Sequence, residues 1–294
     1  MDWDLAQLRA FAAIVDHGTL DAAATALHLT PSAVSQRLKA LEKSVGAVLL
    51  RRSRPAAPTE ASQPVLRLAR QMAALTTEAG VVLPSNGPGL PEVRLAVNAD
   101  SLATWTLPAL APVAHEVRIT FLREDQDHTA ELLRDGTAMA AITSQRLPVQ
   151  GCTVEPLGAM RYRPVASAEF VARWFADGVS PATLAAAPVV VFDTRDLLQT
   201  DRLVEAGVPA DAPPTHTVPA STQFSEAVRY GYGWGMLPDL ENRTWPGVDL
   251  AALPGSALRP FDVALFWQQW SLHTASLDAV ADAVRAGAAR SLRR

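Results

Sequence analysis

Residues 18–46, GTLDAAATALHLTPSAVSQRLKALEKSVG, constrain the fold more than any other stretch of the chain, because they predict two short helices joined by a tight turn. The first predicted helix, 20–27, contains several alanines, whose small side chains let a second helix approach closely. Thr30 is a good N-cap, and Pro31 suits the first helical position, where its missing N–H is no loss. A second helix is therefore predicted to begin there.

The second helix is predicted to have one buried face and one polar face. The buried stripe, at helical spacing, consists of Val34, Leu38, Leu41 and Val45. The polar side chains on the opposite face are Ser32, Ser35, Gln36, Arg37 and Lys39. Hydroxyl, amide, guanidinium and ammonium groups of this kind read base edges and phosphates in the major groove of DNA.

Basic charge is concentrated in the same region. Six Lys or Arg residues and one acid, Glu42, lie between Ser32 and Arg54, although the formal net charge of the chain is -4. Local charge of this kind favours a helix-turn-helix that binds DNA, with the second helix in the groove. The alternative is an ordinary helical hairpin with a solvated basic face, and His28 stands where a helix-turn-helix most often has glycine.

The flanking segments complete a small predicted domain. The helix predicted over 4–16 ends at Gly18, and its apolar stripe consists of Leu5, Leu8, Phe11, Ala12 and Val15. Residues 47–50 predict a short strand, and the basic residues of 51–54 predict a wing along the phosphate backbone or, alternatively, a solvated turn. Pro55 and Pro58 are expected to stop regular structure.

The stretch DAAATALHLTPSAVSQRLKALEKSVGAVLLRRS, residues 21–53, resembles the N-terminal signature of LysR-type transcriptional regulators, and the rest of the chain has the length and order of that family. The resemblance implies an α/β protein with an N-terminal all-α winged helix-turn-helix domain over 1–58. It also implies a two-lobed, periplasmic-binding-protein-like effector region of Rossmann-like α/β subdomains over 92–294.

The winged helix-turn-helix interpretation assigns two roles to its polar residues. Arg37, Lys39, Arg51, Arg52 and Arg54 are expected mainly to neutralise phosphates, and Ser32, Ser35 and Gln36 to read bases. The full set predicted to contact DNA is Thr30, Pro31, Ser32, Ser35, Gln36, Arg37, Lys39, Arg51, Arg52 and Arg54.

A linker helix is predicted over 59–83, followed by a hinge, PSNGPGLP, at 84–91. The apolar side of this helix is too extensive to face water alone, and it consists of Val65, Leu66, Ala69, Met72, Ala73 and Leu75. In LysR-type regulators the matching helix pairs with a second subunit, which implies a homodimer or homotetramer. The chain departs from the family at Ser62, where a glycine is usual, and we expect only a small change at the helix start.

Beyond the hinge, predicted strands alternate with helices, which favours βαβ units and a parallel sheet. The first set of predicted elements comprises strands 93–97, 117–122 and 138–143 with helices 101–115 and 129–135. The second comprises strands 187–193 and 261–270 with helices 197–205, 221–231 and 273–289. We expect lobe I at about 92–161 and 268–294, and lobe II at about 162–267.

Ligand-binding groups are predicted where strands end in this region. A helix N-terminus capped by Asp100 or Ser101 is expected to hold a carboxylate, unless it is simply a well-capped helix. Acids follow a strand in each half, at Glu124, Asp125 and Asp127 and at Asp193 and Asp196. N–H groups at one end and carboxylates at the other would suit lysine or arginine, although most exposed carboxylates only bind water.

The segments VNADSLATW, LGAMRYRPVAS, APVVVFD and LFWQQW resemble the lysine- and arginine-sensing branch of the family, called ArgP or LysG, which activates an exporter of basic amino acids. By position, the resemblance implies that Ser101, Leu102, Thr104 and Trp105 line the pocket. The full predicted effector set is Asn98, Asp100, Ser101, Leu102, Thr104, Trp105, Glu124, Asp125, Thr143, Asp193, Asp196, Ser221 and Thr222. Operator DNA and RNA polymerase are the implied partners.

Other function classes find little support in the sequence. One cysteine, Cys152, cannot form an internal disulfide, and no secretion signal or run of 18 apolar residues is present, so we expect a cytoplasmic protein. No catalytic motif, phosphate-binding glycine loop or zinc-spaced cluster appears, so we expect no enzyme, metal or cofactor. Three alternatives stay open: a different effector, a two-lobed enzyme or transport protein, and a non-specific DNA-architectural protein.

Overall fold

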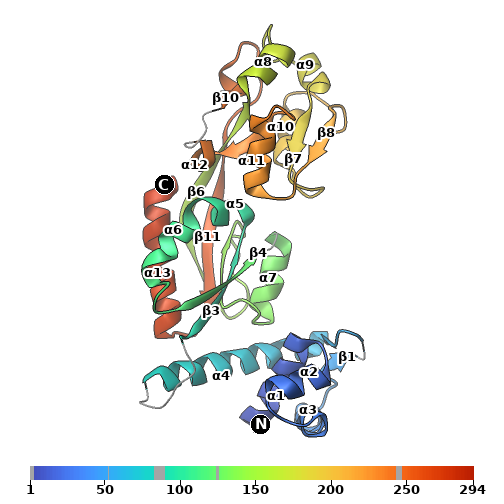
Figure 1. Cartoon of the computed structure of the whole chain (residues 1–294), viewed down its shortest axis with the longest axis vertical. Coiled ribbons are helices and arrows are strands. Elements are labelled where there is room, and N and C mark those ends of the chain that lie inside the picture. The colour runs from blue at the N-terminus through green and yellow to red at the C-terminus, as the bar shows by residue number, and fades with distance from the viewer. Residues whose placement is uncertain (1–2, 52, 83–89, 124–125, 243–246) are drawn as a thin grey trace. The chain divides into compact units, whose positions relative to one another are not determined.

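A computed structural model describes residues 3–51, 53–82, 90–123, 126–242 and 247–294 (Figure 1). The chain divides into two compact units. Unit 1 comprises Met1–Val97, Pro112–Glu155 and Trp267–Asp282. Unit 2 comprises Asn98–Ala111, Pro156–Phe266 and Ala283–Arg294. Several elements, including the long strands β6 (Cys152–Ala166) and β11 (Phe261–Trp270), have residues in both units.

Three helices form the N-terminal part of unit 1, and each begins at a side-chain cap. The helices are α1 (Leu5–His17), α2 (Leu20–Ala26) and α3 (Pro31–Val45). The caps are Asp4, Thr19 and Thr30, whose side-chain oxygens accept hydrogen bonds from the amides of Ala6, Ala22 and Ala33. These caps satisfy amides that have no partner inside a helix. The predicted helix-turn-helix, with Pro31 in the first turn of its second helix, is confirmed.

The turn between α2 and α3 depends on a left-handed residue. His28 has φ 53°, a conformation that glycine adopts without steric cost and other residues rarely adopt. This geometry explains why glycine is common at this position of a helix-turn-helix. Gly18, at the end of α1, has φ 75°, which confirms the predicted helix end.

The core of these helices differs from the predicted stripe of α1. Leu8, Ala10, Phe11, Ala13 and Ile14 are buried, whereas Leu5, Ala12 and Val15 are only half-buried. The reason is that α1 packs on two sides. Leu8 and Phe11 join a cluster that includes Leu41 of α3 and residues of α4, and Ala10, Ala13 and Ile14 join a second cluster with α2 and α3.

A two-stranded hairpin follows α3. Strand β1 (Leu50–Arg51) pairs antiparallel with β2 (Ala57–Pro58), so the predicted wing is present. Pro58 pairs with Leu50, and the expectation that Pro58 stops regular structure is wrong. Glu42 helps to position the hairpin, because its carboxylate accepts a hydrogen bond of 2.9 Å from the amide of Leu49.

The linker helix α4 (Gln63–Val82) follows one short 3-10 turn, Glu60–Ser62. Ser62 is buried and its hydroxyl donates to the carbonyl of Thr59 at 2.7 Å, so serine is accommodated in this turn. Val65, Leu66 and Ala69 are buried in the core with α1 and α3. Ala73 and the larger Met72 and Leu75 belong to the predicted apolar side but are exposed in this single chain. The predicted hinge, 84–91, lies outside the described residues except for Leu90 and Pro91.

The α/β part of unit 1 contains the predicted parallel sheet. Strand β3 (Glu92–Val97) pairs in parallel with β4 (Arg118–Arg123) and with β5 (Ala140–Thr143). Helix α7 (Gln126–Arg134) connects β4 to β5, as expected of a βαβ unit. The end of β11 lies beside β5, where the amide of Trp270 donates to the carbonyl of Met139 at 3.0 Å.

Unit 2 contains mixed strands and most of the short helices. Its part of β6 pairs antiparallel with β9 (Gly235–Pro238) and β10 (Val248–Asp249), and β7 (Val189–Val191) pairs in parallel with β8 (Thr215–Thr217). The helices in sequence order are α8 (Ala168–Trp174), α9 (Pro181–Ala186), α10 (Leu198–Glu205), α11 (Ser221–Arg229) and α12 (Asp239–Asn242). The sequence patterns did not predict β6, α8, α9, β8, α12 or β10. The burial pattern of β6 shows no clean alternation that would mark a strand.

The helical segment after β3 contains an irregular turn. It comprises α5 (Ala99–Ser101), a π-helical turn (Leu102–Thr106), α6 (Leu107–Leu110) and a 3-10 turn (Ala111–Val113). Pro108 lacks the N–H that a regular α-helix would donate to the carbonyl of Thr104, so the α-helical ladder is interrupted beside this turn. Within unit 2, α6 packs closely against α13 (Ala275–Ser291).

Gly287 of α13 permits this close packing, and it provides a stability test. A Cβ atom added at Gly287 would lie 2.2 Å from the Cβ of Ala109. We expect Gly287→Ala to lower the free energy of unfolding, because overpacking costs about 1–3 kcal/mol and exceeds the roughly 1 kcal/mol that alanine gains over glycine in a helix. Chemical denaturation measures this change.

The double variant Gly287→Ala/Ala109→Gly serves as the control, because it removes the opposing Cβ atom. Its stability should exceed that of Gly287→Ala alone. Equal losses in the single and double variants would show that the close approach of α6 and α13 does not limit the residue at position 287.

Candidate nucleic-acid interface and ligand site

The exposed face of α3 presents the polar residues that the sequence predicted for base contacts. Ser32, Gln36 and Lys39 are exposed, and Ser35 is half-buried. Val34 and Leu41 are fully buried on the opposite side, so the core fixes which side of α3 faces outward. Thr30 caps the helix and Pro31 is exposed beside it. This arrangement offers hydroxyl and amide groups in the first two turns of α3.

The predicted phosphate-binding residues fall into two groups. Lys39, Arg51 and Arg54 are exposed, on α3 and on the hairpin, and none of them forms an ion pair with another described residue. Arg37 is half-buried and lines a pocket together with Asp4, the N-cap of α1, and Arg9 of α1. Arg52 lies outside the described residues.

The helix start after β3 differs from the prediction in its cap. Asn98 caps α5, because its side-chain oxygen accepts a 2.7 Å hydrogen bond from the amide of Ser101. Neither Asp100 nor Ser101 is the cap, contrary to expectation. The Ser101 amide is therefore already engaged, and the idea that this helix start holds a ligand carboxylate loses one of its donors.

Asp100 is held by two hydroxyl groups from other elements of unit 2. The hydroxyl of Tyr162 on β6 donates to one carboxylate oxygen at 2.6 Å, and the hydroxyl of Ser221 on α11 donates to the other at 2.7 Å. Burial, and then the charge of Asp100, keep the pKa of Tyr162 well above its usual value, so the phenol stays a donor. The ring of Tyr162 stacks on Phe261 with centroids 5.6 Å apart.

The π-helical turn next to Asp100, and Ser101 just before it, contain buried polar atoms. Ser101 and Trp105 are buried, and their Oγ and Nε1 atoms have no hydrogen-bond partner among the described residues. Thr104 is half-buried and donates to the carbonyl of Asp100 at 2.6 Å, and Leu102 is half-buried. Irregular turns of this type often occur at functional sites.

Two further acids of unit 2 share the electrostatic environment of Asp100. Burial raises the pKa of Asp196, and the negative charges of Asp100 and Asp193 raise it further, although amide hydrogen bonds oppose these effects. Burial also raises the pKa of Glu241, on α12, to about 7, with the charge of Asp100 adding to the shift and a hydrogen bond with Ser225 opposing it. We call Asp100, Asp196 and Glu241 the acidic cluster. A cationic group placed among them would favour their ionised forms.

The remaining predicted ligand residues are more dispersed. The carboxylates of Asp193 and Asp196 accept hydrogen bonds within their own loop, from the amides of residues 192, 195, 196 and 198. Thr222 is exposed, and Thr143 belongs to unit 1, where its hydroxyl accepts from the amide of Gln145. Glu124 and Asp125 lie outside the described residues, as does the side chain of Asp127.

Glu241 is the functional candidate that the sequence analysis missed. It lies in a four-residue helix far along the chain from Asp100, and no local motif marks it. Within the part of the chain that the structure describes, no group of three or more His, Cys, Asp or Glu side chains is arranged to hold a metal ion. Among the described helices, none is both long enough and apolar enough to cross a membrane.

Two family models match the sequence. The family described as "Bacterial regulatory helix-turn-helix protein, lysR family" matches residues 5–63. The family described as "LysR substrate binding domain" matches residues 87–289. The first match covers α1 to the start of α4, and the second covers the α/β region that contains the acidic cluster.

Curated proteins and solved structures are similar over nearly the whole chain. The HTH-type transcriptional regulator LysG of Mycobacterium tuberculosis is 46% identical, covering 96% of this chain and 92% of the relative. The lysine export transcriptional regulatory protein LysG of Corynebacterium efficiens is 42% identical, covering 93% and 95%. A structure of full-length LysG from Corynebacterium glutamicum with bound effector Arg has a TM-score of 0.79 and 35% identity, covering 99% of this chain and 100% of that one.

The raised pKa of Glu241 predicts a pH-dependent loss of stability. The folded protein retains the proton of Glu241 up to about pH 7, whereas the unfolded chain releases it near the ordinary value of 4.5. The folded state therefore binds more protons in this window, and the contribution of Glu241 to stability falls as pH rises from 4.5 to 7. We expect Glu241→Gln to remove this contribution.

Thermal unfolding between about pH 5 and about pH 8 measures the effect. The Tm of Glu241→Gln minus that of the wild type should increase with pH and then level off. Glu116→Gln, which removes an exposed carboxylate, controls for the change in net charge. A Tm difference that stays constant with pH would show that Glu241 titrates in the folded protein as it does in the unfolded chain.

Proposed function

The chain belongs to the LysR family of bacterial transcriptional regulators, and from this premise we propose that it binds a specific operator and responds to a basic amino acid. The observation that carries the proposal is the exposed polar face of α3, with Ser32, Gln36 and Lys39 opposite a fully buried apolar side. We assign base contacts to Ser32, Ser35 and Gln36, and phosphate contacts to Lys39, Arg51 and Arg54.

The proposed effector is arginine or lysine. The acidic cluster supports this choice, because neither Asp100 nor Asp196 forms an ion pair with a described Lys or Arg side chain. Bringing a guanidinium or ammonium group to these half-buried carboxylates offsets the cost of their mutual repulsion. The related LysG of Corynebacterium glutamicum, with its bound effector Arg, supports the same ligand class.

The proposed target is a gene for an exporter of basic amino acids, because a relative at 42% identity is named a lysine export regulator. We propose a homodimer or homotetramer that pairs through α4, whose Met72 and Leu75 are exposed in the single chain. Bound at an operator, the protein would act on RNA polymerase. We propose a cytoplasmic location, because the operator DNA that it would bind lies in the bacterial cytoplasm.

A salt titration of operator binding tests the assigned DNA contacts. Each phosphate neutralised by a cationic side chain contributes roughly -0.9 to the slope of log affinity against log salt concentration. We expect Lys39→Ala to weaken binding and to make the slope shallower by about 0.9 per subunit. Fluorescence anisotropy with labelled operator DNA measures both quantities.

Ser32→Ala is the matched control on the same helix. It removes a neutral hydroxyl, so affinity for the operator should fall while the salt slope stays unchanged. If Lys39→Ala leaves the slope at its wild-type value, Lys39 contacts no phosphate and the proposed orientation of α3 on DNA is wrong.

Calorimetry tests the proposed effector. We expect the wild-type protein to bind arginine and lysine and to give no binding heat with glutamate. Asp100→Asn keeps the size of the side chain and one of the two oxygens that accept from Tyr162 and Ser221. It replaces the other oxygen by an NH2 donor and removes one negative charge from the acidic cluster. Arginine affinity should therefore fall by about tenfold or more, as expected for loss of a charge-assisted contact.

Asp211→Asn serves as the control for net charge, since Asp211 is exposed on a turn. It should leave arginine affinity unchanged. Equal affinity of the wild type for glutamate and arginine would refute a site selective for cationic ligands.

A further inference from the structure

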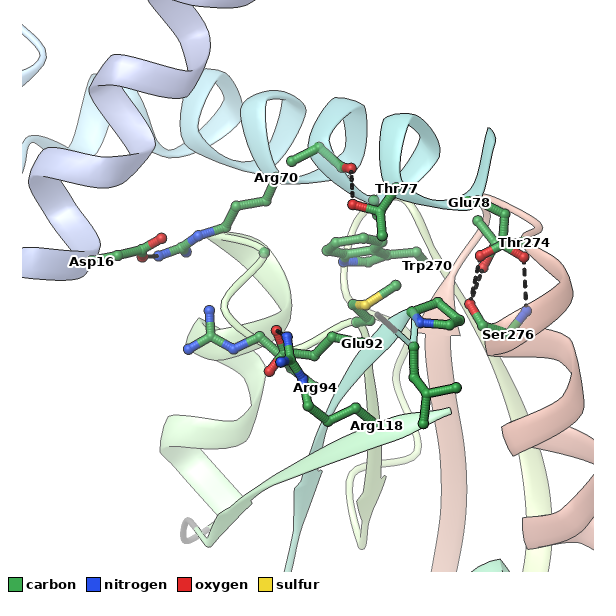
Figure 2. Close-up of a pocket in the computed structure, with 16 residues that line it drawn as sticks. Asp16, Arg70, Thr77, Glu78, Glu92, Arg94, Arg118, Trp270, Thr274 and Ser276 are labelled. Atoms are coloured by element: carbon green, nitrogen blue, oxygen red, sulfur yellow. Dashed lines mark hydrogen bonds and ion pairs between the residues drawn. The ribbon is translucent and has the colours of Figure 1, made fainter. Parts of the chain in front are cut away.

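Three charged residues attach α4 to other parts of unit 1, and Figure 2 shows two of them, Arg70 and Glu78. Arg67 donates to the carbonyls of Gln150 and Gly151. Glu78 accepts from the amide of Ser276 at 3.1 Å and from its hydroxyl at 2.8 Å. Arg70, between them in sequence, makes the most contacts, and its contacts are of a different kind.

Arg70 bonds to two separate parts of unit 1. One guanidinium nitrogen, Nη2, donates to the carboxylate of Asp16, in the last turn of α1. The other, Nη1, donates to the carbonyl of Asp135 at 2.9 Å, to its carboxylate at 3.3 Å and to the hydroxyl of Thr137 at 2.7 Å. Arg70 therefore links the DNA-binding helices to the turn that leads into β5.

The local sequence holds each partner in place. Arg70 follows Ala69, which is buried in the core with α1 and α3, so its position relative to Asp16 is fixed by packing. The turn at 135–137 is closed by a 2.7 Å hydrogen bond from the amide of Thr137 to the carboxylate of Asp135. Gly136 in this turn has φ 77°, and a Cβ there would lie 3.1 Å from the Cα of Arg67. The turn therefore lies directly against α4.

Polar contacts matter here because a pocket of about 540 Å³ separates part of α4 from the α/β part of unit 1. Arg70, Glu78, Glu92 and Trp270 line this pocket, as Figure 2 shows. Apolar packing therefore holds only part of the length of α4 against the α/β part of unit 1. The side chain of Arg70 is only 10% exposed, so its ion pairs are partly shielded from solvent.

The turn bonded to Arg70 also connects, along the backbone, to the ligand site. Thr137 leads into β5, and β5 pairs in parallel with β3, where Ala141 lies opposite Ala96 and Ile142 opposite Val97. Val97 is followed directly by Asn98, the N-cap of α5, and Asp100 of the acidic cluster comes two residues later. A shift of these strands would move both the Asp100 backbone and the partners of Arg70.

We propose that Arg70 is the positioning residue that couples the effector region to the DNA-binding helices, because one guanidinium bridges Asp16 and the Asp135–Thr137 turn. This inference rests on the proposed effector function. A planar guanidinium with two separate donor nitrogens can bond both sides at once, whereas the compact ammonium group of lysine cannot span them in the same geometry. Arg67 and Glu78 bond α4 to the α/β part, and none of their hydrogen bonds among the described residues goes to α1.

The test measures operator affinity with and without saturating arginine, and arginine affinity by calorimetry, in the full-length protein. The quantity of interest is the ratio of the two operator affinities, which typically lies between about 5 and 150 for coupled sites. We expect Arg70→Met and Asp16→Asn each to bring this ratio close to 1 while arginine and operator still bind. Arg70→Lys should restore only part of the ratio, and Arg67→Met should keep the wild-type ratio.

A wild-type ratio in both Arg70→Met and Asp16→Asn would overturn the inference, as would an equal loss of coupling in Arg67→Met. If the wild type binds no arginine, the proposed effector function fails instead. The contact itself is then tested by thermal unfolding of Arg70→Met, Asp16→Asn and the double variant. If the Tm loss of the double variant is smaller than the sum of the two single-variant losses, the result supports the bridge between Arg70 and Asp16. Strictly additive losses contradict it.

Discussion

The burial of one side of α3 is the constraint on which the proposed DNA contacts depend. Val34 is fully buried with α1 and α2, and Leu41 with α1 and α4, so α3 cannot rotate without exposing them. The side that remains outside carries Ser32, Gln36 and Lys39. Leaving those two apolar side chains in water would cost about 2–3 kcal/mol each, which exceeds any single surface contact. The core therefore decides which groups reach DNA.

In the acidic cluster, burial has the opposite effect, because it makes the ionised carboxylates less favourable. Burial raises the pKa of Asp196, and burial with the charge of Asp100 raises that of Glu241 to about 7. The folded state gains no stability from this arrangement, and a cationic ligand would relieve the electrostatic repulsion. Asp100 is also fixed by Tyr162 and Ser221, so its carboxylate is held in one position before any ligand arrives.

Sequence periodicity and caps predicted α1 to α3, the wing and the parallel strands β3 to β5, because each depends on local side chains such as Thr30 and Pro31. The cap before α5 was misassigned since Asn98, Asp100 and Ser101 are all plausible caps within four positions. Glu241 was missed because its contact with the environment of Asp100 joins segments far apart in the chain, which no local pattern records. The single chain leaves Met72 and Leu75 exposed, so it does not test the predicted pairing of α4 with a second subunit.

A footprint on the DNA upstream of the protein's own gene, with and without arginine, tests the central claim most directly. The account predicts two protected half-sites with centres roughly one helical turn apart, about 10 base pairs or a multiple of it. It further predicts that arginine changes the protected pattern and that glutamate does not. Protection spread evenly along the DNA, or a pattern that arginine leaves unchanged, would contradict it.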